Sequence, residues 1–289
     1  MKVLLTGAGG QAGRAFGALC AQADALVALS HAQLDITDPA QVRRAVQAHA
    51  PQWIVNAAAF TAVDAAESAR APAHDLNATA VGHLAAAARD AGARLLHIST
   101  DFVFDGEASR PYRPDAATAP LGVYGATKLA GEHAARAAAA TSIIVRTSWV
   151  YAAYGQNFVR TMLRLMASKP EIRVVCDQIG SPTWATSLAR VLWRMIEIDA
   201  PTGIYHWSDA GVASWYDFAV AIQEEALQRG LLARAIPVLP IPAAEYPTPT
   251  RRPHYSVLDT ARTHTLTGMP AVHWRTQLRS MLEELAAAG

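Results

Sequence analysis

The stretch Thr6-Gly7-Ala8-Gly9-Gly10-Gln11-Ala12-Gly13 joins a short apolar run to a segment with a helical pattern of apolar residues. Its small residues fit two spacings, Gly7-x-Gly9-x-x-Ala12 and Gly7-x-x-Gly10-x-x-Gly13. Glycines at a strand-to-helix junction let the backbone approach a pyrophosphate closely, and the first N–H groups of the helix then point at that anion. The stretch therefore predicts a dinucleotide-binding loop between the first strand and the first helix of a parallel sheet.

Outward from this loop, the first half of the chain alternates apolar strand-like runs with helix-like segments. Asp38-Pro39 supplies an N-cap and a proline at the first helical position, and Gly92 ends a later helix. Strands that are almost continuously apolar are typical of a parallel sheet buried between two helical layers. We predict strands over residues 2–6, 25–29, 53–58, 94–99 and 142–145, and helices over residues 11–22, 75–91 and 123–140 and from residue 39 onward.

The pattern loosens after about Val150. Prolines at 240, 242, 247 and 249 exclude a helix or an inner strand, so residues 237–253 should form a long ordered loop. Helices are expected over residues 157–169 and 186–198, from the N-cap Ser214 to about 228, and over 275–288, with a strand over 173–176. The fold class is α/β: a doubly wound, Rossmann-type parallel sheet with a smaller C-terminal substrate-binding lobe. Residues 1–150 form the dinucleotide-binding domain and 151–289 mainly the lobe, with about 172–198 returning to the first domain.

Composition narrows the class of protein. Hydrophobic residues make up 52% of the chain and charged residues 17%, which favours a compact globule. The net charge of +1 gives no reason to expect a nucleic acid or an anionic membrane as a partner. The first apolar run is too short for a signal peptide and no stretch is long enough to span a bilayer, so we expect a cytoplasmic protein. Cys20 and Cys176 form no metal or disulfide pattern and should be core thiols.

The end of the second strand bears on the choice of cofactor. Leu29-Ser30-His31 contains no carboxylate of the kind that binds the adenosine ribose of NAD, so nothing there repels a 2′-phosphate. No arginine follows either, so NADPH is favoured and NADH stays an alternative. Asp35-Ile36 lies a few residues further on and could flank the adenine.

Tyr124 and Lys128 are the candidate catalytic pair. Their i,i+4 spacing places them on one face of a helix. A tyrosine has an ordinary pKa of about 10, and a neighbouring ammonium lowers that pKa and makes proton transfer easier. Thr100, at the end of the fourth strand, could hold a substrate carbonyl oxygen while Tyr124 protonates it. The small residues that follow Asn56, at the end of the third strand, would leave room for a dinucleotide.

Together these motifs resemble the extended short-chain dehydrogenases, and within them the dTDP-4-dehydrorhamnose reductase family. The resemblance covers essentially the whole chain, and the ordered combination of motifs is far more specific than any one of them. The motifs that carry it are the phosphate loop and residues 56–64 (NAAAFTAVD), 99–104 (STDFVF), 123–132 (VYGATKLAGE), 146–151 (RTSWVY) and 246–253 (YPTPTRRP).

The resemblance implies an activity and roles for residues. The activity is reduction of the C4 keto group of dTDP-4-dehydro-L-rhamnose by NADPH or NADH, which gives dTDP-L-rhamnose for a cell-surface polysaccharide such as the O-antigen of lipopolysaccharide. Tyr124 would donate the proton, Lys128 would bind the nicotinamide ribose and tune Tyr124, and Thr100 would orient the carbonyl. Asp101 and Trp149 would contact the dTDP-sugar, and Arg251 could pair with its diphosphate. The cofactor-binding residues would be Gly7, Gly10, Gln11, Ala12, Gly13, Ser30, Asp35, Ile36, Ala59, Phe60, Thr61, Tyr124 and Lys128.

The chain departs from the family at a metal site. Some members bind Mg²⁺ between subunits through glutamates, one of which aligns with Thr186 here, while Glu284 matches the other. A threonine is a poor ligand for a hard cation in place of a carboxylate. We therefore expect no protein-held metal, doubt a role for Mg²⁺, and expect a monomer or weak homodimer.

Three other functions stay open from the sequence. The chain could reduce a different nucleotide sugar, or be a nucleotide-sugar dehydratase or epimerase. Dehydratases usually carry a glutamate after the Thr-Asp pair, where Phe102 stands here, which favours reduction. It could also be a non-catalytic regulatory subunit that resembles the β subunit of methionine adenosyltransferase. The histidines have no partners that suggest a metal site and are interpreted as packing or surface residues; they include His97, His206, His254 and His273.

Overall fold

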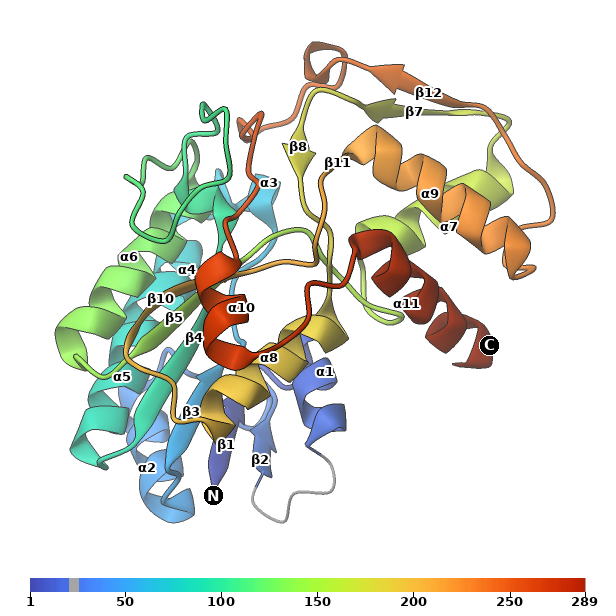
Figure 1. Ribbon diagram of the computed structural model, residues 1–289. Helices are drawn as coiled ribbons and strands as arrows, with labels where there is room; N and C mark the ends of the chain where they lie inside the picture. The colour runs from blue at the N-terminus through green and yellow to red at the C-terminus, as the bar shows by residue number, and fades with distance from the viewer. Residues whose placement is uncertain (21–25, 289) are drawn as a thin grey trace.

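A six-stranded parallel sheet forms the centre of the molecule in the computed structural model, which describes residues 1–20 and 26–288. The chain runs from β1 outward to β2 and then crosses to β3 on the other side of β1, so the strand order reverses between β1 and β3 (Figure 1). Ligands bind at such a switch point, beyond the carboxyl ends of the strands. In spatial order the strands are β2 (Leu26–Leu29), β1 (Val3–Thr6), β3 (Trp53–Asn56), β4 (Arg94–Thr100), β5 (Ile143–Thr147) and β10 (Gly203–Trp207).

Helices cover both faces of this sheet (Figure 1). On one face α1 (Gln11–Leu19) and α8 (Ala185–Glu197) pack together over a core that contains Phe16, Leu188 and Tyr205. On the other face lie α2 (Pro39–His49), α5 (Ala80–Asp90) and α6 (Val123–Ala138). The doubly wound sheet predicted from the sequence is therefore confirmed.

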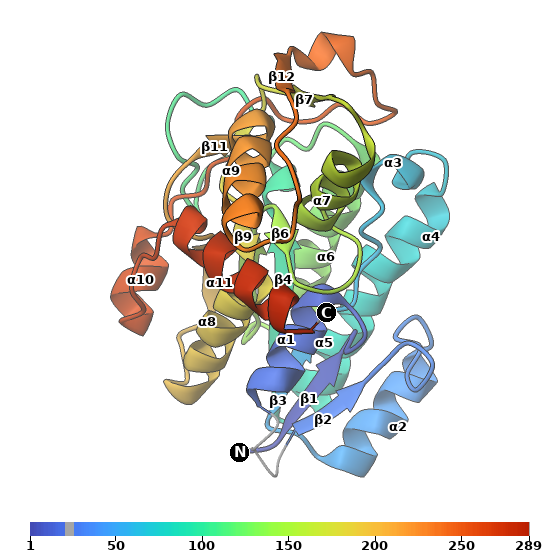
Figure 2. The ribbon, with the colours of Figure 1, turned by 90° about the vertical axis from the view of Figure 1, so that its right-hand side faces the viewer.

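The C-terminal part of the chain builds a smaller lobe beside the carboxyl end of the sheet (Figures 1 and 2). Phe218, Trp274 and Met281 are buried in its own apolar core. Its helices are α7 (Phe158–Ser168), α9 (Trp215–Gln228) and α11 (Trp274–Ala288). Its strands pair two by two: β6 (Val150–Tyr151) with β9 (Thr183–Trp184), β7 (Ile172–Val175) with β12 (Val238–Ile241), and β8 (Ile179–Gly180) with β11 (Ala213–Ser214).

Helix starts follow the capping residues in the sequence. Asp38 accepts hydrogen bonds from the N–H groups of Ala40 and Gln41, and Pro39 is the first residue of α2. Ser214 and Asp217 form a capping box at the start of α9. Both satisfy N–H groups that would otherwise be left unpaired at a helix N-terminus.

Several boundaries differ from those predicted. The first helix ends at Leu19; positions 21 and 22 of the predicted helix, and position 25 of the predicted second strand, lie outside the described residues. The third strand ends at Asn56 rather than at residue 58, and the helix predicted over 75–91 begins as a π-helical turn, Asp75–Thr79, before α5. The sequence did not predict β10 or the short helices α3 (Val63–Ala66), α4 (Arg70–His74) and α10 (Ala261–Thr267), or the single 3₁₀ turns Asp101–Val103 and Ala243–Glu245.

The proline-rich segment is not wholly a loop, because β12 lies within it and includes Pro240. A proline lacks the N–H group that a central strand needs, but β12 has a single neighbour, β7, within the described structure. The segment near residues 172–198 divides: β7 pairs with β12 outside the main sheet, whereas α8 packs against α1.

Two smaller findings concern the cysteines and the membrane. Cys20 is buried, as predicted, whereas Cys176 is only half-buried. Of the helices in the described part of the chain, none is long and apolar enough to cross a bilayer.

Candidate active site

The phosphate loop is closed by glycines that no larger residue could replace. Gly7 has a φ of +70°, and a Cβ atom there would lie 2.4 Å from the backbone nitrogen of Ala58, beyond β3. A Cβ atom at Gly13 would lie 2.2 Å from the carbonyl oxygen of Gly7. Gly10 caps α1 with no side-chain hydrogen bond from the described residues, which leaves the first N–H groups of the helix free. The loop therefore fits a pyrophosphate at the switch point of the sheet.

The predicted adenosine side of the cofactor site begins at the end of β2. The Ser30 hydroxyl donates a hydrogen bond to Gln33 Oε1 at 2.8 Å. The Asp35 carboxylate accepts from both the N–H and the hydroxyl of Thr37, and these bonds hold the pKa of Asp35 below its ordinary value. The side chain of Ile36 is buried in the core next to α2, so only its backbone is placed to meet a cofactor.

Gln11 connects the phosphate loop to the C-terminal lobe. Its Oε1 accepts a hydrogen bond from Asn157 Nδ2 at 2.9 Å, and its carbonyl oxygen accepts from the hydroxyl of Tyr154 at 3.3 Å. Asn157 is also the N-cap of α7. The first turn of α1 is thus fixed to the start of α7, so a cofactor on this loop would lie beside the lobe.

Residues 59–61 are held against the catalytic helix by Asn77. The amide of Asn77 accepts from the N–H of Phe60 at 2.8 Å and donates to its carbonyl oxygen at 3.1 Å. It also donates to the hydroxyl of Thr127 on α6 at 3.1 Å. Asn77 lies in the π-helical turn, a distortion that is frequent at functional sites. Ala59, Phe60 and Thr61 are thereby placed next to the helix that carries Tyr124 and Lys128.

Tyr124, Lys128, Thr100 and Asp101 come together where β4 ends against the first two turns of α6. All four side chains are buried, and Lys128 Nζ donates a hydrogen bond to the carbonyl oxygen of Ile98 at 2.7 Å. The Thr100 hydroxyl lies 3.0 Å from Asp101 Oδ1. Among the described residues, Asp101 Oδ2 has no hydrogen-bond partner, which leaves a buried acceptor for a ligand hydroxyl.

Burial sets the protonation of these groups. It raises the pKa of Tyr124 to about 12, against the hydrogen bond from Thr100, so that the phenol keeps its proton at neutral pH. It raises the pKa of Asp101 to about 6. It also lowers the pKa of Lys128 to about 8, although the Glu132 carboxylate opposes that shift. Perturbed groups gathered in one place are typical of a site that transfers protons.

Trp149 lies on the lobe side in a strained conformation. Its φ of +48° is rare for a bulky residue and costs on the order of 1–3 kcal/mol. The indole stacks on Trp215 with ring centroids 3.5 Å apart, and it also lies against Gly180, where a Cβ atom would be 2.5 Å from the ring. Strain of this kind persists where the surroundings hold a functional side chain in place.

The proline-rich segment packs against the start of α6. Thr250 is buried, and its hydroxyl donates to the carbonyl oxygen of Val63 at 3.0 Å. Arg252 pairs with Asp64 at 2.8 Å, and this pair holds the pKa of Asp64 below its ordinary value even though burial opposes it. A cavity of about 570 Å³ lies between this segment and α7, and its lining includes Trp215, Tyr246, Thr248 and Arg252.

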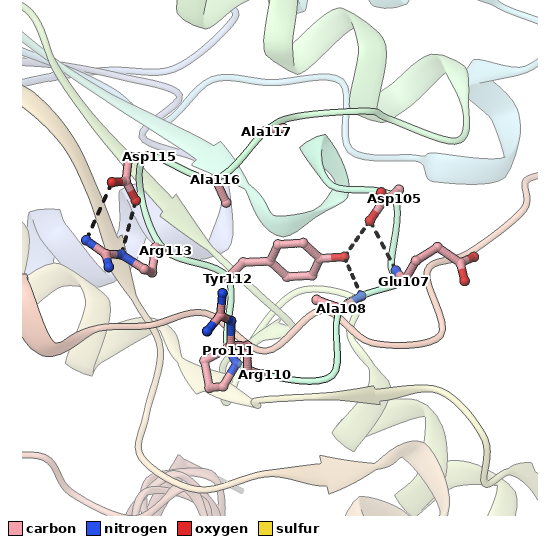
Figure 3. A pocket seen from close by; sticks show the side chains of 10 residues that line it. All are labelled: Asp105, Glu107, Ala108, Arg110, Pro111, Tyr112, Arg113, Asp115, Ala116 and Ala117. Carbon is pink, nitrogen blue, oxygen red and sulfur yellow. Dashed lines mark hydrogen bonds and ion pairs between the residues drawn. The ribbon is translucent and has the colours of Figure 1, made fainter.

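Arg251, the predicted partner of the diphosphate, instead lies at the surface and pairs with Glu107 at 3.5 Å. Glu107 also lines a second pocket, of about 420 Å³, shown in Figure 3. There Tyr112 donates to Asp105 at 2.6 Å, and Arg113 pairs with Asp115 (Figure 3). Its polar groups are thus largely paired with one another, and its lining contains none of the predicted site residues.

Comparison with known proteins identifies the family to which this site belongs. The family described as "RmlD substrate binding domain" matches residues 1–287. The chain belongs to the RmlD family. It is 41% identical to the dTDP-4-dehydrorhamnose reductase of Escherichia coli over 99% of this chain and 98% of that protein. It is 42% identical to the spore coat polysaccharide biosynthesis protein SpsK of Bacillus subtilis, over 99% of each chain.

Solved structures agree with this membership of the RmlD family. The crystal structure of a dTDP-4-dehydrorhamnose reductase from Clostridium acetobutylicum superimposes with a TM-score of 0.93 at 38% identity, over 99% of each chain. The enzyme of that name from Bacillus anthracis, crystallised in complex with NADP, gives 0.92 at 37% identity, over 98% of this chain and 100% of that one. The family resemblance read from the sequence motifs is confirmed.

Sequence reasoning missed several residues of this RmlD-family site. Asn77 and Trp215 each hold a predicted site segment in place, and neither belongs to a motif that carries its own chemical signal. Arg252 lies within the motif 246–253, but its pairing with Asp64 was not predicted. Arg252 is adjacent to the predicted Arg251, and the alternation of facing side chains in an extended segment could have suggested either. His97 was interpreted as a packing residue, yet its ring lies 3.4 Å from Lys128 Nζ.

Proposed function

We propose that this chain reduces the C4 keto group of dTDP-4-dehydro-L-rhamnose to give dTDP-L-rhamnose, with NADPH as the hydride donor. One observation carries the proposal: Tyr124, Thr100 and Lys128 gather at the end of β4, beside a phosphate loop closed by glycines. The chain that holds them matches dTDP-4-dehydrorhamnose reductases over its full length. The product would serve the synthesis of a cell-surface polysaccharide, in keeping with the relatives' names.

The residues divide the work of a carbonyl reduction. Bound NADPH would supply the hydride to C4. Tyr124 gives its proton to the C4 oxygen as negative charge develops there, and the Thr100 hydroxyl donates a hydrogen bond to the same oxygen. A phenol whose pKa is raised to about 12 is protonated before the reaction, as a proton donor must be. Lys128 would bind the nicotinamide ribose and, as an ammonium, would stabilise the phenolate that forms when Tyr124 gives up its proton.

The cofactor site favours NADPH over NADH. Leu29-Ser30-His31, at the end of β2, contains no carboxylate, and the relative from Bacillus anthracis was crystallised with NADP. Gly7, Gly10, Gln11, Ala12 and Gly13 would hold the pyrophosphate. The rest of the dinucleotide would lie along Ser30, Asp35, the backbone of Ile36, Ala59, Phe60 and Thr61.

The substrate would lie between the two lobes. The unpaired Asp101 Oδ2 and the strained Trp149 would contact the sugar and its nucleotide. Arg251 would reach the diphosphate only by leaving Glu107, an exposed pair that costs little to break. Residues 1–150 with α8 and β10 would bind the cofactor and supply the residues that meet the keto group, and the rest of the chain would mainly bind the sugar nucleotide.

Phe102 favours reduction over dehydration or epimerisation. Its ring meets that of Tyr124 edge-on, with centroids 5.5 Å apart and planes at 74°. An apolar ring in this position offers no second acid or base for removing a proton from a neighbouring carbon.

We expect a monomer or weak homodimer with no metal held by the protein. Thr186 stands where family members that use Mg²⁺ carry one of the two glutamate ligands, so only the other, matched by the exposed Glu284, is present. Sedimentation in Mg²⁺ and in EDTA should give the same mass; a dimer that forms only with Mg²⁺ would contradict this.

The test follows NADPH absorbance with enzymatically prepared dTDP-4-dehydro-L-rhamnose. Tyr124→Phe should lower kcat by about 10²–10⁴-fold, the usual value of a positioned acid, with little change in NADPH affinity. Tyr205→Phe is the matched control, because that hydroxyl donates to Pro201 at the far edge of the sheet. Equal turnover in wild type and Tyr124→Phe would remove Tyr124 from the mechanism. No wild-type turnover with either cofactor would refute this substrate and leave another nucleotide sugar, or a regulatory role, to be tested by binding.

A further inference from the structure

A chain of buried polar side chains runs beneath the phosphate loop to the catalytic lysine. The hydroxyl of Thr6 donates to Asn56 Oδ1 at 2.7 Å, Asn56 Nδ2 lies 3.0 Å from His97 Nδ1, and His97 Nε2 lies 3.4 Å from Lys128 Nζ. All four side chains are no more than 2% exposed. Polar groups buried this deeply are stable only when donors meet acceptors, so their protonation can be worked out link by link.

The orientation of the Asn56 amide is fixed by the backbone. The N–H of Ala58 donates to Asn56 Oδ1 at 3.1 Å, and an N–H group can only donate. Oδ1 therefore faces Ala58 and Thr6, and the NH₂ group faces His97. Because that NH₂ group donates, Nδ1 of His97 must be the acceptor, and a neutral ring then carries its proton on Nε2.

The ring of His97 is neutral for two independent reasons. An imidazolium would bring an N–H on Nδ1 against the NH₂ group of Asn56. Burial, and then the positive charge of Lys128, also hold the pKa of His97 well below its ordinary value. The proton on Nε2 therefore points at Lys128 Nζ.

This arrangement disfavours the ammonium form of Lys128. Nζ already donates to the carbonyl oxygen of Ile98, and as an amine it can accept the Nε2–H of His97 with its lone pair. As an ammonium it has no lone pair, so two donors face each other at 3.4 Å.

We propose that His97, with its proton held on Nε2 by Asn56, is a positioning residue that weakens the hold of Lys128 on its third proton. The consequence for catalysis rests on the proposed reductase function: the ammonium is the form that stabilises the Tyr124 phenolate, so His97 would set the pH above which reduction fails.

Glu132, Asp101 and Tyr124 are further titratable groups near Lys128. Glu132, one turn further along α6, raises the pKa of Lys128, but both its carboxylate oxygens are bound by Arg146 from β5 at 2.9 and 2.7 Å. Tyr124 faces the site from the start of α6 and is neutral, since burial raises its pKa to about 12. Asp101, at the end of β4, has a pKa raised by burial to about 6, so it is a carboxylate where Lys128 titrates, and its Oδ1 accepts a hydrogen bond from the Thr100 hydroxyl. His97 remains the polar group of β4 whose side chain meets Nζ directly.

The first test reads the tautomer in the free protein. In ¹⁵N-histidine-labelled protein, the signal that disappears in His97→Phe should show a protonated Nε2 and an unprotonated Nδ1. In Asn56→Asp the carboxylate accepts instead of donating, so the proton should move to Nδ1. A wild-type ring with its proton on Nδ1, or a cationic ring at neutral pH, overturns the proposal.

The second test titrates Lys128 without substrate. Lys2, Lys128 and Lys169 are the only lysines of the chain, so ¹³C-lysine spectra hold few signals, which Lys2→Arg and Lys169→Arg assign. Asn56→Asp should raise the titration midpoint of Lys128 by at least about one pH unit, a tenfold gain in proton affinity, and His97→Phe should raise it as well. His264→Phe, outside this network, is the control. A midpoint unchanged in both folded variants overturns the proposal.

The pH dependence of kcat/KM distinguishes a failure of this proposal from a failure of the proposed function. The upper limb of the pH profile of kcat/KM should move to higher pH in Asn56→Asp by the shift seen in the lysine titration. A merely structural role would lower kcat/KM at every pH without moving the limb, and that result would refute the proposal. An inactive wild-type protein would refute the reductase function, while the two titrations would still decide the role of His97.

Discussion

Gly13 lies where the first turn of α1 comes closest to the phosphate loop. A Cβ atom there would be 2.2 Å from the carbonyl oxygen of Gly7 and 2.9 Å from Ala8, both backbone atoms that cannot move aside. Gly17, one turn further along the same helix, has no neighbouring atom within 4 Å of its hypothetical Cβ. One helix thus offers a glycine that the fold requires and a glycine that it does not.

We therefore predict opposite effects for two alanine substitutions. Gly13→Ala should displace the loop and weaken NADPH binding at least about tenfold, because the N–H groups lose their alignment on the pyrophosphate. Gly17→Ala should leave the affinity unchanged and stabilise the protein by roughly 0.5–1 kcal/mol. Fluorescence titration with NADPH and chemical denaturation measure the two effects. Equal affinities in the two variants would show that the loop does not hold the cofactor.

At the same scale, the sequence could predict which residues come together in the candidate site, because it places Thr100 at a strand end and Tyr124 and Lys128 on one face of a helix. Tyr124, Lys128 and Thr100 meet for this reason. His97 could not be recognised in this way: its partner Asn56 is 41 residues away, and only the pairing of β3 with β4 brings them together. The direction of an amide in the core is likewise absent from any sequence pattern.

At the scale of elements, one buried ion pair joins the strands and helix around the site. Arg146 on β5 binds Glu132 on α6 through two hydrogen bonds, and the two side chains are 3% and 1% exposed. Ser99 on β4 donates to the same carboxylate. Because both charges are out of water, each depends on the other for its stability.

Glu132→Gln should therefore destabilise the protein by about 3–5 kcal/mol, since it leaves the Arg146 guanidinium buried without its counter-charge. The double variant Glu132→Leu/Arg146→Met removes both charges and should recover much of that loss. Urea denaturation of Glu132→Leu, Arg146→Met and the double variant gives the coupling energy. Additive losses would mean that the pair does not act as a unit.

Elements with strong local signals were predicted, and elements that depend on a distant partner were not. Asp38-Pro39 and Ser214 mark helix starts because a cap bonds its own first turn. The strand β10 is short and follows a turn, and its place as the sixth strand comes from pairing with β5, about 60 residues earlier. In β12, Pro240 correctly excluded an inner strand, but a two-stranded edge needs fewer N–H donors.

At the scale of the whole molecule, Asp209 joins the cofactor-binding sheet to the smaller lobe. It follows β10, and its carboxylate accepts hydrogen bonds from the N–H of Trp184 at 2.8 Å and from the hydroxyl of Ser187, at the start of α8. Burial raises the pKa of Asp209 to about 7, although these two hydrogen bonds lower it. The junction between the lobes therefore contains a carboxyl group that titrates near neutrality.

The sign of its effect on stability follows from linkage. The folded pKa of Asp209 lies above the ordinary value of 3.8, so between these values the native state binds more protons than the unfolded state, and its stability falls as pH rises. The contribution is present at low pH and is lost as pH passes through about 7. Asp209→Asn stays neutral, and its amide oxygen can still accept from Trp184 while its NH₂ group donates to Ser187.

We predict that Asp209→Asn gains stability over wild type as pH rises, by on the order of 2 kcal/mol between about pH 5 and pH 8. Denaturation midpoints of both proteins across this range measure the difference. Subtracting the stability of wild type from that of the variant at each pH cancels the contributions of other titrating groups. One of these is Asp105, whose pKa the Tyr112 hydroxyl lowers, so that its contribution to stability is lost as pH falls. Parallel curves for the two proteins would mean that Asp209 keeps its charge at the junction, and its environment would then have to be more polar than its burial indicates.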